Sequence, residues 1–74
     1  MIVQVMNKVY KMTNEQADEV LKVAKEQIPF GIYAVKKGNM LIACRDKASS
    51  RTQLKKMIRD YKAKGFTKVY SNGL

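Results

Sequence analysis

The side chains of this sequence that could bind a charged partner are the cations between Ser49 and Phe66. The stretch reads SSRTQLKKMIRDYKAKGF and contains six Lys or Arg residues against one carboxylate. Lys and Arg donate charge-assisted hydrogen bonds to phosphate oxygens, and clustered cations bind polyanions by releasing counterions. The chemistry that this run predicts is therefore anion binding.

Helical spacing gathers most of these charges into one band. With Leu54 as the zero direction of an ideal helix, five cations fall between about 60° and 200°, beside an apolar stripe close to zero. The same band is also typical of an ordinary solvated helix face, so the pattern leaves both interpretations open. The predicted binding residues are the band itself, Arg51, Lys55, Lys56, Arg59 and Lys62, with Arg45, Lys47 and Lys68 as expected extensions.

The net charge of +9 is unevenly distributed along the chain. Residues 1–30 hold four cations and four carboxylates, whereas residues 31–74 hold eleven cations and two carboxylates. Such asymmetry favours a polyanionic or acidic partner. We therefore expect a small basic module that associates with DNA or RNA with weak sequence specificity. The alternative is a protein-interaction module, an inhibitor or regulator of phage or mobile-element type, that binds an acidic surface of a larger host protein.

Other chemistry has little support in the sequence. Histidine is absent, which removes the commonest general base and metal ligand. Cys44 is the only cysteine, so neither an intramolecular disulfide nor a cysteine-based metal cluster can form. It lies in the apolar run MLIACR and is expected to be a small buried hydrophobe. The carboxylates form no persuasive catalytic pair and the glycines are isolated, so we expect no enzyme activity, cofactor or metal.

The elements that must position the cations follow from local patterns. Residues 2–11 alternate apolar and polar side chains, which predicts a half-buried strand. The stretches TNEQ, at Thr13, and SRTQ, at Ser50, are capping boxes that open two amphipathic helices. Pro29 ends the first helix and Gly65 ends the second. Between the helices, GIYAVKKGNMLIACRD predicts a hairpin with a KGN turn, and FTKVYS predicts a last strand.

This order of elements predicts an α+β fold of one small domain, residues 1–74. Strand, helix, strand, strand, helix, strand is the order of the β-α-β-β-α-β, or ferredoxin-like, plait. The expected sheet has four antiparallel strands in the order 4-1-3-2, with both helices on one face.

A sheet covered on one side only would leave its other face open. Alternation predicts an apolar contact surface there, for a partner or for a homodimer, which could also form at an edge strand. Its expected members are Met6, Lys8, Tyr10, Ile32 and Leu41.

The sequence also indicates a compartment. No apolar run approaches the roughly 18 residues that a membrane-spanning helix needs. The N-terminal stretch MIVQVMNKVYKM lacks the charged start and apolar block of a signal peptide. A cytoplasmic protein without membrane contact is expected.

Overall fold

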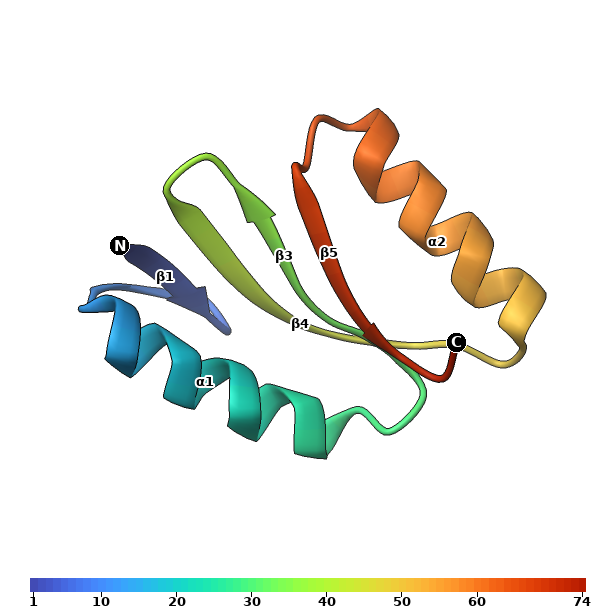
Figure 1. The fold of residues 1–74 in the computed structure, drawn as a ribbon, viewed down its shortest axis with the longest axis horizontal. Helices are drawn as coiled ribbons and strands as arrows, with labels where there is room; N and C mark the ends of the chain where they lie inside the picture. The colour runs from blue at the N-terminus through green and yellow to red at the C-terminus, as the bar shows by residue number, and fades with distance from the viewer.

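The structure, a computed structural model, describes residues 1–74 and contains two helices and a five-stranded mixed sheet, an α+β arrangement (Figure 1). One helix lies on each side of the sheet. The elements in chain order are β1 (Ile2–Val5), β2 (Lys8–Lys11), α1 (Asn14–Gln27), β3 (Gly31–Lys37), β4 (Met40–Lys47), α2 (Arg51–Ala63) and β5 (Lys68–Asn72).

The strand order in the sheet is β2-β1-β4-β3-β5. The predicted hairpin between β3 and β4 is present and antiparallel, and the predicted contact between β1 and β4 is present but parallel. The last strand, β5, pairs with β3 and not with β1. The four-stranded antiparallel plait was therefore wrong in its strand order, its strand number and its purely antiparallel pairing.

The predicted first strand is a hairpin of two short strands. β1 and β2 pair from Ile2 opposite Lys11 to Val5 opposite Lys8, so the connection has only two residues, Met6 and Asn7. Met6 has a φ of 57°, the left-handed conformation that two-residue hairpin loops require. No glycine marks this turn, and the alternation of apolar residues continues across it.

Helix α1 begins and ends where the sequence predicts. The Thr13 hydroxyl accepts a hydrogen bond from the Gln16 N–H at 3.2 Å, and the Gln16 side chain accepts one from the Thr13 N–H at 3.0 Å. The C-terminal carbonyls of Lys25 and Ile28 accept hydrogen bonds from the Asn72 side chain, at 3.0 and 2.8 Å. Strand β5 is thereby joined to the end of α1, where helix carbonyls would otherwise lack partners.

Helix α2 is capped by Ser50, whose hydroxyl accepts the Gln53 N–H at 3.1 Å. The predicted capping box is only half formed, because the Gln53 side chain accepts hydrogen bonds from Ser49 instead. The helix ends before Gly65, which has a φ of 97° and so adopts the expected left-handed turn.

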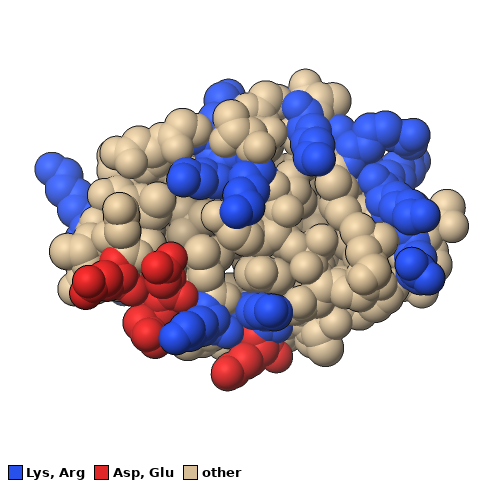
Figure 2. All heavy atoms as spheres, in the orientation of Figure 1, with Lys and Arg blue, Asp and Glu red and all other residues tan.

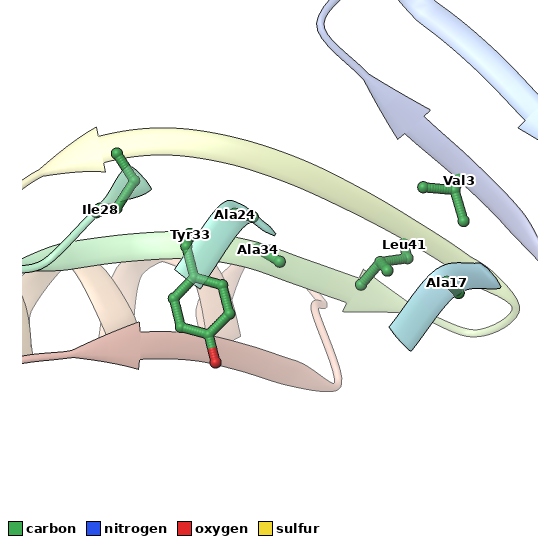
Figure 3. Packing of buried hydrophobic residues seen from close by; sticks show 7 residues of the cluster. All are labelled: Val3, Ala17, Ala24, Ile28, Tyr33, Ala34 and Leu41. Carbon is green, nitrogen blue, oxygen red and sulfur yellow. The ribbon is translucent and has the colours of Figure 1, made fainter. Parts of the chain in front are cut away.

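The two helices cover opposite faces of the sheet, so the prediction of both helices on one face was wrong. On the α1 side the core consists of seven buried residues, shown in Figure 3: Val3, Ala17, Ala24, Ile28, Tyr33, Ala34 and Leu41. On the α2 side, Ile32, Val35 and Leu54 form a second cluster.

Strand β3 contributes to both clusters. The pairing register changes between Ile32 and Ala34 on both sides of the strand, which breaks the alternation of its side chains. Ile32 consequently points to the α2 side, while Tyr33 and Ala34 both belong to the α1 side. A strand that is apolar on both faces needs a cover on each, and the two helices supply it.

Candidate functional site

The predicted cationic band lies on the flank of α2 that points away from the middle of the sheet. Leu54 is fully buried against β3, and Tyr61 extends from α2 to β4, where its hydroxyl donates a hydrogen bond to the Asp46 carboxylate. On an ideal helix with Leu54 at zero, Tyr61 falls at about −20°, whereas the five cations fall between about 60° and 200°, on the other side of Leu54. They therefore point away from β4 into solvent. We call this surface the cationic flank; it consists of Arg51, Lys55, Lys56, Arg59 and Lys62.

The spacing within the cationic flank is regular. Arg51, Lys55, Arg59 and Lys62 follow one another at intervals of four, four and three residues, which gives one cation per helical turn. The ridge from Arg51 to Lys62 is about 16 Å long at 1.5 Å per residue. Along one strand of a duplex, where charges recur every 3.4 Å of axis, that length corresponds to about five phosphates.

None of these cations is neutralised within the protein. All five side chains of the flank are exposed, and the only ion pair in the structure joins Lys22 to Glu19 on α1, at 3.5 Å. Figure 2 shows the acidic side chains gathered over α1, where lysines accompany them, and positive side chains without acidic neighbours over α2. The acidic side chains visible in this view are therefore confined to the side of the molecule away from α2.

The structure does not bring all of the expected extensions to this flank. Arg45 lines a groove on the α1 side of the sheet, and Lys68 lies over the ring of Tyr70 on that same side, with its Nζ 4.8 Å from the ring centroid. Both point away from α2, because the alternation of β4 and β5 turns them to the opposite face. Lys47 is exposed at the end of β4, four residues before Arg51.

The predicted open face of the sheet does not exist as one surface. Ile32 and Leu41 are 0% and 1% exposed, and they lie under different helices. Met6, Lys8 and Tyr10 are exposed, all within or beside the β1–β2 hairpin. The expectation fails because each face of the sheet is covered by one helix, α1 over Leu41 and α2 over Ile32.

A small polar cluster holds α2 against β4. Burial is the largest cause that raises the pKa of Tyr61. The hydrogen bond to Asp46 and the negative charge of Asp46 raise it further. The pKa of the nearby Cys44 thiol is raised to about 11, mainly by burial and then by the Asp46 charge. Cys44 is half-buried and its thiol is protonated at neutral pH, which makes it a poor nucleophile.

A groove that the sequence did not predict opens between α1 and the β1 end of the sheet. Its volume is about 480 Å³ and its lining is mostly apolar. Arg45, Glu19 and Gln27 provide its polar atoms, and the remaining lining residues are Val5, Met6, Val20, Val23, Ala24, Ala43 and Cys44. The residue that indicates this groove in the sequence is Val23. It is apolar but lies outside the buried stripe of α1, and it is 53% exposed.

No three side chains of His, Cys, Asp or Glu lie close enough together to hold a metal ion. Neither helix combines the length and the apolar character that crossing a lipid bilayer would take.

Comparison of the chain with models of protein families, with curated proteins and with solved structures found no significant match.

Proposed function

We propose that the protein is a non-enzymatic module that binds the phosphate backbone of DNA or RNA along the cationic flank of α2. The observation that carries this proposal is a ridge of exposed cations, one per turn, that have no carboxylate partner. Like charges four residues apart destabilise a helix by about 0.2–0.5 kcal/mol per pair, so the stability of α2 does not account for the ridge. Contact with a polyanion accounts for it.

The mode of binding follows from the side chains. Arg51 and Arg59 can each grip a phosphate with two hydrogen bonds, and the lysines between and after them act as point charges. Phosphate contacts position a protein on nucleic acid without reading its bases, so the sequence preference is weak. The flank offers no exposed aromatic ring on which a base could stack, which favours backbone contact over base readout.

The test is a titration of labelled single- and double-stranded oligonucleotides, followed by fluorescence anisotropy. With five phosphates neutralised, the logarithm of the duplex binding constant falls with a slope of about −4.5 against the logarithm of salt. Raising salt from 50 to 200 mM then weakens binding by about 500-fold.

A pair of charge-matched variants tests the location. The variant Arg51→Glu/Arg59→Glu lowers the slope by about 1.8 for the two lost phosphate contacts, and repulsion weakens binding further. The control Lys22→Glu/Lys25→Glu changes the net charge equally on α1, and should bind nearly as the unmodified protein does. Equal loss in the two variants would show that only net charge matters, and no binding at low salt would refute the proposal.

A pull-down distinguishes the alternative partner, an acidic protein surface, from nucleic acid. If the cationic flank serves a protein, a pull-down from nuclease-treated lysate retains a stoichiometric partner that Arg51→Glu/Arg59→Glu loses. Binding that disappears with nuclease supports nucleic acid instead.

A further inference from the structure

One edge of the sheet has unpaired backbone groups whose positions can be assigned. Met1 and Met12 exchange two hydrogen bonds of 2.9 Å across the start of the β1–β2 pair. In an antiparallel pair such residues alternate with residues whose backbone groups point outward. From the register, Lys8 and Tyr10 are bonded to β1, and the N–H and C=O groups of Val9 and Lys11 face the free edge.

A second copy of the chain pairs with this edge most favourably in one register. When two identical strands meet antiparallel about a two-fold axis perpendicular to the sheet, residues on the same face must oppose one another. A Lys8 or Lys11 axis would place two like charges directly opposite each other, which is destabilising. A Tyr10 axis, at a non-hydrogen-bonded pair, would set the apolar Val9 opposite the charged Lys11. A Val9 axis sets Val9 opposite Val9 and avoids both pairings.

The side chains next to the axis are also complementary. Lys8 and Tyr10 lie on the α1 side of the sheet, because they pair with Val5 and Val3 of the α1-side core. A Val9 axis sets Lys8 of each copy opposite Tyr10 of the other. A lysine over a tyrosine ring is a favourable contact, and the chain already contains one within β5, between Lys68 and Tyr70.

Exposed apolar side chains gather at the same edge. Met6, Val9 and Tyr10 are 68%, 64% and 43% exposed, although hairpin residues of a monomer would favour polar types here. Met6 also lines the groove under α1, and so does Val5, the cross-strand neighbour of Lys8. Tyr10 of the second copy would therefore extend the apolar surface of this groove across the two-fold axis.

The distribution of charge permits this contact. Residues 1–30, which include the β2 edge, have equal numbers of cations and carboxylates. The hairpin and α2 lie toward opposite ends of the longest axis, which measures 34 Å (Figure 1). Charges farther apart than the Debye length of about 8 Å at physiological salt are largely screened. The two cationic flanks then add little repulsion to a contact at β2.

We infer that two copies of the protein pair antiparallel at β2 about Val9, joining their sheets into one of ten strands. Four exposed residues per edge make a small interface, so the association is weak and depends on concentration. It needs no nucleic acid and stands or falls separately from the binding proposed for α2.

Sedimentation or light scattering over a range of concentrations measures this association. The mass should rise from 8.5 kDa toward twice that value. Val9→Lys places like charges on the axis and should raise the dissociation constant at least about tenfold. Leu74→Lys introduces a lysine at a similarly exposed apolar residue outside the groove and should leave association within about threefold, with circular dichroism confirming that both variants fold.

Cross-linking tests the register itself. In a Cys44→Ala background, Val9→Cys brings two Cα atoms to about 5.5 Å, within the range of a disulfide. Lys11→Cys leaves its two copies about 13 Å apart in this register, which is too far. A constant mass of 8.5 kDa up to millimolar protein, or Lys11→Cys linking as fast as Val9→Cys, would overturn the inference.

Discussion

Replacing Tyr61 with Phe is the sharpest test of how α2 is held to the sheet. The substitution removes the hydroxyl that donates to Asp46, and keeps the ring with its edge-to-face contact on Phe66, at a centroid distance of 5.5 Å. Hydrogen bonds to charged groups contribute about 1.5–3 kcal/mol to stability. Asp46 is only half-buried, so water can replace part of that bond. We expect a loss of about 1–2 kcal/mol in the free energy of unfolding.

The loss is large enough to measure by thermal and urea denaturation. In a domain of 60–100 residues each kcal/mol shifts the melting temperature by about 4–8 °C, so the variant should melt about 5–15 °C lower. Tyr10→Phe removes the hydroxyl of an exposed ring and should melt within about 2 °C of the unmodified protein.

A double-mutant cycle isolates the hydrogen bond from other effects. Tyr61→Phe, Asp46→Ala and the double variant should give a coupling energy near 1 kcal/mol, because the two side chains interact directly. A coupling below about 0.3 kcal/mol would refute the role assigned to this bond, whatever the single variants do.

Three further outcomes are expected. Gly31→Ala should lower the free energy of unfolding by more than about 3 kcal/mol or abolish folding, because its φ is 147° and the new Cβ would overlap the Asp46 carbonyl oxygen. Gly38→Ala, at a φ of 58° in open space, should lower it by about 1 kcal/mol. Equal losses of stability in urea titrations of the two variants would contradict this explanation. Thr13→Ala should cost about 1 kcal/mol by removing the α1 cap, which helix content and urea midpoint measure. Stability should fall as pH rises from about 9 to 11, because folding raises the pKa of Cys44 from 9.0 to about 11 and its contribution holds only while the thiol keeps its proton. Cys44→Ala should reduce the fall in urea midpoints below about pH 10, before Tyr33 and Tyr61, whose pKa values folding also raises from 10.0, begin to contribute.

The local elements of this fold were predictable because their signals are local. Thr13 and Ser50 cap their helices, Gly65 ends α2, and Gly38 turns the β3–β4 hairpin at a φ of 58°. Each of these residues acts through backbone groups within a few positions of itself. Nothing distant in the chain has to be known for the prediction to succeed.

The topology was not predictable by the same means. In the run GIYAV all five residues are buried, which identifies a strand covered on both faces, yet the alternation on either side of it suggested one covered face. The register change at Tyr33 hides this from a count of every second residue. The β1–β2 turn was missed because Met6, unlike Gly or Asn, rarely adopts a positive φ.

The candidate site was predicted as far as it depends on helical geometry. The cationic flank is a property of α2 alone, and its five members share one side of the helix as the spacing requires. Arg45 and Lys68 belong to strands, where side chains switch face at each residue. Arg45 and Lys68 lie beside the cations of α2 only if α2 covers the face of the sheet toward which they point. Which face α2 covers is a property of the whole fold.

Strand β3 lies between β4 and β5 with a helix over each face, so its residues from Gly31 to Val35 are buried by other parts of the chain. Its amide hydrogens can reach solvent only when both clusters come apart, which is the unfolding of the whole domain. The β1–β2 hairpin, with its exposed side chains at the edge, can open alone. Hydrogen exchange in β3 is thus governed by the global stability of the protein, and exchange in β2 by a local opening that leaves β3 and its two covers intact.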